Sequence, residues 1–389
     1  MISEVGLAER SCQVDTYLNR RLELVRGEGV YLYTAAGERY LDMMSNYGVN
    51  ILGYGHPAVT RALTAQISHL PALHCSFNND VRAAASRALI DRLGGSYRRL
   101  YWSNSGAEAI EAALKFAVLA TGRKRFIACR DGYHGKTLGA LSATHGSKYR
   151  AAFEPLLWEF CHIDFGSAEA LESAIDDETA AFLVEPIQGE SGVLIPDATY
   201  LRAVREICDR TGVLLILDEI QTGAGRTGTF LASRHSGVDG DIVCLGKGIA
   251  GGVPIGITAT TAEVADRIGR SAHTSTFGGN PLACAGVLAV LGVLDDSFLA
   301  EVAAKGRVFM ERLSELDSPL VKAVRGSGLM IGVEVFSKRN EILQSLQRAR
   351  ILTIPAGENV VRFLPPYVID EAHLESVVET LNRTSPWRR

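Results

Sequence analysis

The sequence predicts an α/β protein with a large, mainly parallel sheet and a second, smaller α+β domain. Between about residues 98 and 260, short apolar runs bounded by turn residues alternate with stretches of helical periodicity. This alternation is typical of parallel strands that are covered by helices on both faces. After about residue 300 the order becomes helix, strand, helix, strand, helix. A chain of 389 residues is long enough for two such domains.

The N-terminal segment, residues 1–56, is expected to join the smaller domain, with the large domain over 57–299 and the C-terminal part over 300–389. A helix is predicted within residues 1–20. Residues 27–42 alternate apolar and polar side chains around Ala36-Gly37, which predicts a hairpin. The glycine-rich, aromatic stretch 43–56 either lines a site or is a packed connector. Helical spacing follows over 57–69.

The strands of the large sheet are predicted from short apolar runs. They cover residues 100–103, 125–129, 180–184, 213–217, 242–245 and 255–259. In the C-terminal part we expect a helix over 303–316, a strand over 328–336, a helix near 339–350, a strand over 360–364 and a last helix from about residue 371.

Composition excludes several classes of function. The formal net charge of −4 gives no reason to expect a nucleic-acid or acidic membrane partner. No apolar run approaches the roughly 20 residues that cross a bilayer, and residues 1–15 have acids early and no apolar core of a signal peptide. The seven cysteines are widely spaced and include no Cys-x-x-Cys, which argues against disulfides and zinc and favours the cytoplasm.

Two predicted strands of the large sheet are followed by a charged residue. Asp218 follows the run 214–217, and Lys247 follows the run 242–245 and Gly246. The carboxyl ends of parallel strands are where open α/β sheets bind ligands. Our hypothesis is that Lys247 binds pyridoxal phosphate as a Schiff base and that Asp218 pairs with the pyridinium nitrogen. Either residue alone is more simply a turn residue or a solvated side chain, so the hypothesis depends on the other motifs.

Two further glycine-containing stretches follow predicted strands. Ser105-Gly106-Ala107 opens a helix, and its backbone N–H groups could bind phosphate. Ser105 could equally cap the helix, with Glu108 completing a capping box. In the stretch DGYHGKT, Tyr133 could stack on a planar ring.

Three more stretches offer groups that suit anions. Glu185 and Glu190 lie in the loop EPIQGESG, where they could accept an arginine or remain solvated. The hydroxyl-rich loop HTSTFGGNP contains Thr276 and suits a phosphate. Arg362 lies in the apolar run VVRFLPP, so it should be paired if buried, either with a substrate carboxylate or in a structural salt bridge.

The segment GAGRTG, residues 223–228, matches the Gly-x-Gly-x-x-Gly pattern of dinucleotide-binding loops. No apolar helix follows it directly, because residues 229–236 hold only three apolar side chains. It also lies in the middle of the chain, five residues after Asp218, and a dinucleotide-binding loop would not account for that carboxylate. A nicotinamide cofactor is therefore disfavoured.

Together these stretches resemble the class III (ω-amino acid) pyridoxal phosphate aminotransferases. The motifs that carry the resemblance occur in the family's order: NSGAEA, YHGKT, EPIQGESG, LDEIQTGAGRTG, the Lys of LGKG, HTSTFGGNP and RFLPP. The resemblance covers about residues 27–381 and implies fold type I, pyridoxal phosphate as cofactor, and a homodimer whose sites are shared between subunits.

The resemblance also implies residue roles. Lys247 and Asp218 are the catalytic pair, and Gln221 is the partner of the cofactor's ring hydroxyl. The implied cofactor site comprises Ser105, Gly106, Ala107, Tyr133, His134, Asp218, Gln221, Lys247 and the partner subunit's Thr276. The implied substrate site comprises Tyr47, Lys136, Glu185, Glu190 and Arg362, in which Glu190 pairs with Arg362 for one substrate and releases it for 2-oxoglutarate.

The implied reaction moves the terminal amino group of ornithine, N-acetylornithine or a similar basic amino acid to 2-oxoglutarate, which gives a semialdehyde and L-glutamate. Lys136 departs from the Arg that acetylornithine, ornithine and 4-aminobutyrate aminotransferases usually carry there. HGKTLGALSAT is similar to putrescine aminotransferases, whereas SNYGVNILGYGHP and VRGSGLMIGVEV are closer to ornithine, acetylornithine and carrier-linked lysine aminotransferases. Putrescine and 4-aminobutyrate therefore remain alternative donors, and an aminomutase or decarboxylase is a remote alternative.

Overall fold

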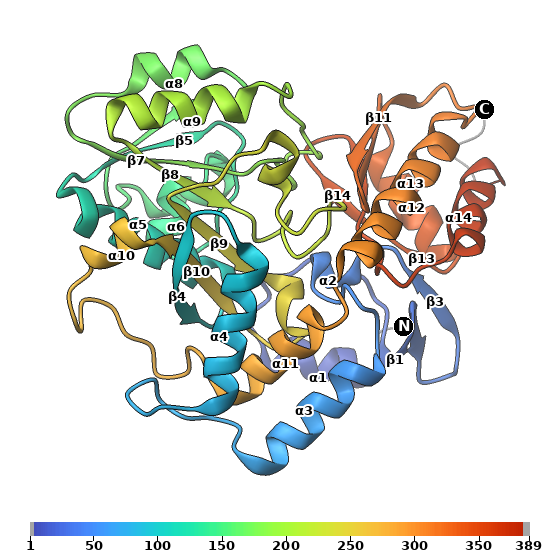
Figure 1. Cartoon of the computed structure of the whole chain (residues 1–389). Coiled ribbons are helices and arrows are strands. Elements are labelled where there is room, and N and C mark those ends of the chain that lie inside the picture. Colours follow the sequence, from blue (N-terminus) through green and yellow to red (C-terminus); the bar gives the residue numbers. More distant parts are fainter. Residues whose placement is uncertain (1–3, 384–389) are drawn as a thin grey trace.

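A seven-stranded sheet forms the centre of the large domain in the computed structural model, which describes residues 4–383 (Figure 1). Its strand order is β4-β10-β9-β8-β7-β5-β6. The strands are β4 (Tyr97–Ser103), β5 (Arg125–Cys129), β6 (Phe160–Ile163), β7 (Thr179–Val184), β8 (Leu214–Asp218), β9 (Ile242–Gly246) and β10 (Gly256–Thr261). The predicted α/β class and its mainly parallel sheet are confirmed.

Alternate side chains of the strands enter two separate apolar clusters. Leu215 and Leu217 of β8 lie in one cluster, and Ile216 between them lies in the other. Side chains of α4 (Asp80–Leu93), α8 (Ala168–Ala174) and α9 (Tyr200–Thr211) belong to the first cluster, and those of α5 (Gly106–Thr121), α6 (Leu138–Ala143) and α10 (Ala262–Asp266) to the second. Helices thus cover both faces, which explains why the strands read as continuous apolar runs.

One strand of the sheet runs against the others, and one was not predicted. β10 is antiparallel to both β4 and β9. The connection from β9 to β10 contains only a short turn of helix, η3 (Lys247–Ala250), and this is too short for a parallel crossover. β6 pairs only with β5 at the edge of the sheet, and three of its four residues are half-buried. Its sequence therefore lacks the apolar run of a central strand.

The smaller α+β domain is built from both ends of the chain, as predicted. One four-stranded sheet has the order β1-β2-β3-β13 and the other β11-β12-β15-β14. The parallel pairing of β13 with β3 joins the C-terminal part to the N-terminal part. The strands are β1 (Leu24–Glu28), β2 (Tyr31–Thr34), β3 (Arg39–Asp42), β11 (Val321–Ser327), β12 (Met330–Val335), β13 (Ile351–Leu352), β14 (Ile354–Ala356) and β15 (Val360–Phe363).

The helices of the smaller domain lie beside these sheets at the right of Figure 1. They are α12 (Asp296–Ser314), α13 (Arg339–Arg348) and α14 (Glu371–Arg383). The remaining helices are α1 (Glu4–Cys12), the irregular turn α2 (Ser45–Gly48), α3 (Pro57–His69), α7 (Ser147–Arg150), the 3-10 turns η1 (Ala151–Phe153) and η2 (Ala232–Ser236), and α11 (Pro281–Leu291). The predicted outer segments reach residues 1–3 and 384–389, which lie outside the described residues.

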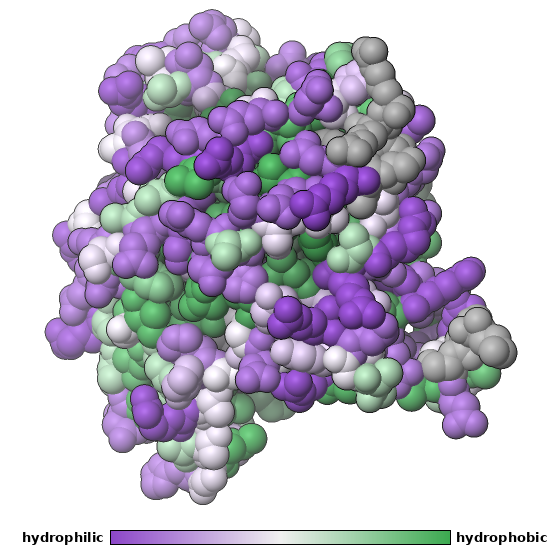
Figure 2. Space-filling view, turned by 90° about the vertical axis from the view of Figure 1, so that its right-hand side faces the viewer, coloured by the Kyte–Doolittle hydropathy of each residue, from purple (hydrophilic) through white to green (hydrophobic). Residues whose placement is uncertain are grey.

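Hydrophilic side chains cover most of the face shown in Figure 2, with smaller apolar areas between them. Over residues 4–383, no single helix has the length and apolarity to cross a membrane, although the bent pair α11 and α12 passes that test together. The seven cysteines are all free. No cluster of His, Cys, Asp and Glu that could hold a metal ion occurs in the described part of the chain.

Candidate active site

The carboxyl ends of five strands converge on one cavity of about 340 Å³. The loops that follow β4, β5, β7, β8 and β9 all reach it, because parallel strands bring their carboxyl ends to one edge of a sheet. The cavity is lined by Gly106, Ala107, Tyr133, His134, Gly135, Lys136, Glu185, Glu190, Asp218, Ile220, Gln221 and Lys247. Ten of these twelve residues belong to the site predicted from the sequence.

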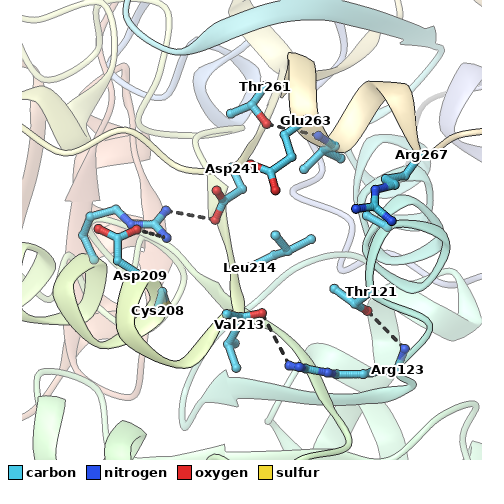
Figure 3. A pocket seen from close by; sticks show the side chains of 14 residues that line it. Thr121, Arg123, Cys208, Asp209, Val213, Leu214, Asp241, Thr261, Glu263 and Arg267 are labelled. Atoms are coloured by element: carbon cyan, nitrogen blue, oxygen red, sulfur yellow. Dashed lines mark hydrogen bonds and ion pairs between the residues drawn. The ribbon is translucent and has the colours of Figure 1, made fainter.

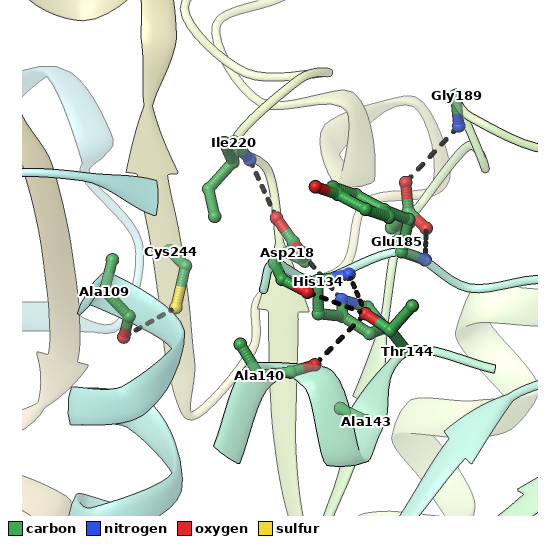
Figure 4. Close-up of polar contacts among 12 residues, drawn as sticks. Ala109, His134, Ala140, Ala143, Thr144, Glu185, Gly189, Asp218, Ile220 and Cys244 are labelled. Carbon is green, nitrogen blue, oxygen red and sulfur yellow. Dashed lines mark hydrogen bonds and ion pairs between the residues drawn. The ribbon is translucent and has the colours of Figure 1, made fainter. Parts of the chain in front are cut away.

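Asp218, the last residue of β8, is held at both carboxylate oxygens (Figure 4). Its Oδ1 accepts a hydrogen bond from the N–H of Ile220 at 3.0 Å, and its Oδ2 lies 2.8 Å from Nδ1 of His134. Burial lowers the pKa of His134, but the hydrogen bond and charge of Asp218 outweigh burial, so the pKa lies above its ordinary value. His134 is itself fixed by its backbone N–H, which donates to Oγ1 of Thr144 at 2.9 Å.

Glu185 lies beside this pair at the end of β7, where Figure 4 shows its carboxylate between two backbone N–H groups. It accepts hydrogen bonds from Tyr133 at 3.0 Å and Gly189 at 3.3 Å. Burial raises the pKa of Glu185 to about 7, against the opposing effect of His134. Of the alternatives that the sequence left open, a solvated loop acid does not apply to Glu185, because its side chain is buried.

Lys247 follows β9 directly and faces the same cavity. Its backbone has φ +47°, a conformation that L residues rarely adopt and that is often retained at functional sites. Burial lowers the pKa of the Lys247 ammonium, and Glu190 and Asp218 oppose that shift only in part. An amine with a lowered pKa loses its proton more readily, as an acid–base group requires.

The N-terminus of α5 points at the cavity through Gly106 and Ala107. Ser105 is the N-cap residue, and its hydroxyl accepts a hydrogen bond from the N–H of Glu108 at 3.2 Å. The carboxylate of Glu108 returns to the N–H of Asn104 at 2.8 Å, one residue before the position of a regular capping box. Ser105 therefore caps the helix, while the first N–H groups of α5 remain at the cavity as an anion site.

Arg362 is fully buried and forms a salt bridge with Glu190, with Nη2 and Oε1 2.8 Å apart. Gln221 joins the pair, because its Oε1 accepts from Nη1 of Arg362 at 3.0 Å and its Nε2 lies 3.4 Å from Glu190. Burial raises the pKa of Glu190, but Arg362 and Lys247 outweigh it, and the pKa lies below its ordinary value. Glu190 and Arg362, 172 residues apart, thus form a closed ion pair beside the cavity.

Tyr133 and Lys136 line the cavity from the loop after β5. The ring of Tyr133 packs edge-on against Tyr149, with centroids 5.6 Å apart. Nζ of Lys136 lies 5.1 Å from the centroid of the same Tyr149 ring, a cation–π contact. Tyr149 was missed in the sequence because nothing near Tyr149 marks it as a neighbour of these residues.

Four predicted site residues do not line this cavity: Ser105 and Arg362, which are described above, and Thr276 and Tyr47. Thr276 is exposed and lines a separate hollow of about 490 Å³ beside α5. Tyr47 is 46% exposed and has φ +60° in the irregular turn α2. The next residue, Gly48, lies close to the Lys247 side chain, while Ile51 and Leu52 are buried, so the 43–56 stretch is both a packed connector and a neighbour of the site.

The chemistry of the cavity fits pyridoxal phosphate. An amine and a carboxylate face it from neighbouring strands, a helix N-terminus offers N–H groups for a phosphate, and an aromatic ring lies on one wall. At two glycines of the cavity wall, neighbouring side chains leave no room for a Cβ. A Cβ on Gly106 would lie 2.8 Å from Ile220, and one on Gly135 would lie 2.8 Å from Ala107. Larger residues at either glycine would fill this part of the site.

Comparison with known proteins gives the family. The family profile "Aminotransferase class-III" matches residues 14–384. The chain is 44% identical over 373 residues to the acetylornithine aminotransferase of Methanopyrus kandleri, covering 95% of each protein. It is 42% identical over 358 residues to the putative [LysW]-aminoadipate semialdehyde/glutamate semialdehyde transaminase of Pyrococcus horikoshii, covering 92% of this chain and 94% of that protein.

Solved structures agree. The ornithine aminotransferase from Toxoplasma gondii superposes with a TM-score of 0.93 at 34% identity, covering 98% of this chain and 94% of that one. The acetylornithine aminotransferase from Elizabethkingia anophelis superposes with a TM-score of 0.85 at 31% identity, covering 97% of each chain. Since the profile and these relatives span almost the whole sequence, the chain belongs to the class-III aminotransferases, which are pyridoxal phosphate-dependent transaminases of fold type I.

Proposed function

We propose that this transaminase moves the terminal amino group of ornithine, N-acetylornithine or a similar basic amino acid to 2-oxoglutarate. The products are a semialdehyde and L-glutamate. The observation that carries the proposal is the buried ion pair of Arg362 with Glu190 at the wall of the Lys247 cavity. A guanidinium that can exchange an internal carboxylate for a substrate carboxylate suits an enzyme whose two substrates differ in charge at that point.

Arg362 and Glu190 would act as a gate. While they are paired, the wall presents no free cation, which suits the terminal amine of the donor. When Glu190 turns away, Arg362 can bind the distal carboxylate of 2-oxoglutarate through two parallel hydrogen bonds. Gln221, which contacts both side chains, would hold the guanidinium in place during the exchange.

Lys247 and Asp218 would carry the proton chemistry. Lys247 would hold the cofactor and, once released by the substrate, move a proton at its Nζ to and from the substrate carbon. Asp218, oriented by His134, would keep a proton on the ring nitrogen. The cofactor, when bound, supplies the electron sink that stabilises the carbanion at the substrate carbon. Tyr133 would stack on the ring, and Gly106 and Ala107 would bind its phosphate.

The donor is the open part of this proposal. Lys136 presents a single ammonium at the cavity, held over Tyr149, where an arginine would offer a planar fork. This arrangement favours a donor whose carboxylate is bound by one charge, with putrescine and 4-aminobutyrate as alternatives. Relatives named for acetylornithine and for [LysW]-aminoadipate semialdehyde both support a basic amino-acid donor.

The proposal includes a homodimer in the cytoplasm. The exposed position of Thr276, outside its own cavity, supports a role in the phosphate site of the other subunit. Seven free cysteines support a reducing compartment. The division into residues 1–56, 57–299 and 300–389 also stays a prediction. A sedimentation measurement at micromolar concentration would test the dimer, because a monomer with full activity would contradict shared sites.

A donor screen tests the reaction itself. Ornithine, N-acetylornithine, putrescine and 4-aminobutyrate are each mixed with the enzyme and 2-oxoglutarate, and glutamate is measured over time. We expect the fastest glutamate formation with ornithine or N-acetylornithine, and none without 2-oxoglutarate. If only diamines react, or if product forms without a keto acid, the proposed donor class or reaction is wrong.

A further inference from the structure

The 223–228 loop, GAGRTG, resembles a dinucleotide-binding motif but lies at the junction of the two domains. It begins five residues after Asp218 and continues the segment that leaves β8. On its other side it meets α12, the turn between β11 and β12, and the segment that follows β15.

Arg226 is the central side chain of the contact and is 1% exposed. Its Nη1 donates to the carbonyl of Leu329 at 3.0 Å and to that of Pro365 at 2.7 Å. Its guanidinium lies 4.6 Å from the ring centroid of Tyr367, whose hydroxyl returns a 3.0 Å hydrogen bond to the carbonyl of Ala224. One cation thus joins the loop to two separate segments of the smaller domain.

The glycines of the loop allow the backbones to approach closely. Gly225 has φ +88°, and a Cβ there would lie 2.4 Å from Leu299 of α12. Gly228 has φ +90°, and a Cβ there would lie 2.6 Å from Ala303 of the same helix. Across the junction, a Cβ on Gly328 would lie 2.5 to 2.8 Å from the backbone of residues 226–228. The N–H of Leu329 also donates to the carbonyl of Arg226 at 3.0 Å.

The chain segment that contains this loop also contacts the gate formed by Arg362 and Glu190, through Gln221. Gln221 bonds the guanidinium of Arg362, and Arg226 bonds the carbonyl of Pro365, three residues further along the chain. The stretch from Arg362 to Pro365 is therefore attached at two points to the segment that begins at Asp218. A shift at Pro365 would move Arg362 relative to Asp218 and Lys247.

We propose that Arg226 is a positioning residue that fixes Arg362 relative to the Lys247 and Asp218 pair. A buried guanidinium whose hydrogen bonds go to backbone carbonyls is costly to desolvate, so an apolar side chain would serve a purely structural role as well. Here Nη1 bonds the carbonyls of two chain segments at once, while the planar guanidinium lies over the ring of Tyr367, and together these contacts define the spacing of the segments. This inference rests on the proposed function of Arg362 as the carboxylate gate.

The test compares Arg226→Lys and Arg226→Met with the wild-type holoenzyme. We expect the KM for 2-oxoglutarate to rise about tenfold or more, since small displacements of a binding group have large effects, while kcat stays within about threefold. The visible absorbance of the bound cofactor should be unchanged, because Lys247 and Asp218 belong to the other domain. Amide hydrogen exchange should increase at residues 360–367 and 327–330 but not in β8 or β9.

Arg234→Met is the matched control. Arg234 lies just beyond the same loop, is half-buried, and bonds the carbonyl of Leu93 at 2.9 Å and Asp239 at 2.7 Å, away from Arg362. It should lower stability without changing the KM. Tyr367→Phe removes the hydroxyl that bonds Ala224 and also interacts with Arg226, but it keeps the ring and the guanidinium. It should give a smaller rise in KM, and it tests the proposal if the Arg226 variants do not fold.

Two results would overturn the proposal. One is a KM and an exchange pattern in the Arg226 variants that match those of Arg234→Met. The other is a fall in kcat together with loss of the cofactor absorbance, which would indicate general disruption. If the wild-type enzyme forms no glutamate from any donor, the proposed function fails instead, and the exchange comparison alone still decides whether Arg226 fixes residues 360–367.

Discussion

The two edges of the large sheet both carry hollows lined by acids and bases, but their charges are arranged differently. At the amino edge, a hollow of about 320 Å³ is lined by Asp209 and Asp241, among others (Figure 3). Arg205 forms ion pairs with both, at 2.8 Å and 2.9 Å. Glu263 and Arg267 on the rim of this hollow are exposed. At the carboxyl edge, Glu185 is buried and Lys247 is half-buried at the cavity, and burial is the largest influence on the pKa of each.

The difference separates stabilising charges from reactive ones. Burial alone would lower the pKa of Arg205, but Asp241 and Asp209 raise it, so its charged form is favoured. At the carboxyl edge burial favours the neutral forms of Lys247 and Glu185 instead. Groups whose charged and neutral forms are close in free energy can exchange protons near neutral pH. Mutations at the two edges should therefore affect different properties.

The largest expected effect is that of Lys247→Ala. Removing the amine that faces the cavity should lower glutamate formation by about 10⁴-fold or more. It should also abolish the visible absorbance band of the lysine-bound cofactor. Both are measured on purified enzyme with saturating donor and 2-oxoglutarate. Lys124→Ala, on the surface near the amino edge, is the control and should retain both properties. Full turnover in the Lys247 variant would refute its assignment.

Asp218→Asn should have the next largest effect. The substitution keeps the shape of the side chain but removes the negative charge that orients His134 and would stabilise the proton on the ring nitrogen. We expect kcat to fall by about 10² to 10³-fold. The pKa of His134, now lowered by burial without the opposing charge of Asp218, should drop below its ordinary value. Asp209→Asn at the amino edge should leave kcat unchanged. Equal losses of kcat in both variants would contradict the distinction between stabilising charges at the amino edge and reactive ones at the carboxyl edge.

Glu185→Gln should change how stability depends on pH. Folding raises the pKa of Glu185 from 4.5 to about 7, so the folded protein holds a proton that the unfolded chain releases. The stabilisation is full below pH 4.5 and is lost as pH rises through about 7, which amounts to about 3 kcal/mol at most. Denaturant unfolding of cofactor-free protein between pH 5 and 8 should show a decline that the variant flattens.

Glu334→Gln is the control for this measurement, because the pKa of Glu334 is shifted in the opposite direction from that of Glu185. Hydrogen bonds from Lys322 and Arg325 hold the pKa of Glu334 below its ordinary value. Its contribution is therefore lost only below this pH range, and the variant should lower stability evenly from pH 5 to 8. If Glu185→Gln behaves in the same way, Glu185 is ionised in the folded protein and the contrast between buried and paired charges does not hold.

The smallest effect is expected for Arg205→Ala at the amino edge. The substitution breaks a mostly shielded ion pair with Asp241 and a second one with the exposed Asp209, and it leaves Asp241 with its bond from the N–H of Leu215. We expect a loss of about 1–2 kcal/mol in the free energy of unfolding. The kcat/KM for 2-oxoglutarate should not change. A tenfold fall in kcat/KM would show that the two edges are coupled.

Much of the site could be predicted because its residues follow buried strands. The runs before Asp218 and Lys247 mark the carboxyl ends of β8 and β9, which the structure brings together in one cavity. Gly106 after β4 and Glu185 after β7 could be predicted for the same reason, because each follows a strand whose carboxyl end lies at the cavity. Local apolar patterns also located six of the seven central strands, all except β6, but the reversed direction of β10 depends on how the short segment after β9 turns.

The sequence by itself determined the α/β class, the strand ends that carry the site, and through its motifs the family. Periodicity and strand-end position are local properties, so they can be read without coordinates. Only the tertiary structure decided that His134 meets Asp218, that Glu190 is paired with Arg362, and that Arg226 bonds the segment after β15. These contacts join residues 84 to 172 positions apart, and chain packing alone sets which of them touch.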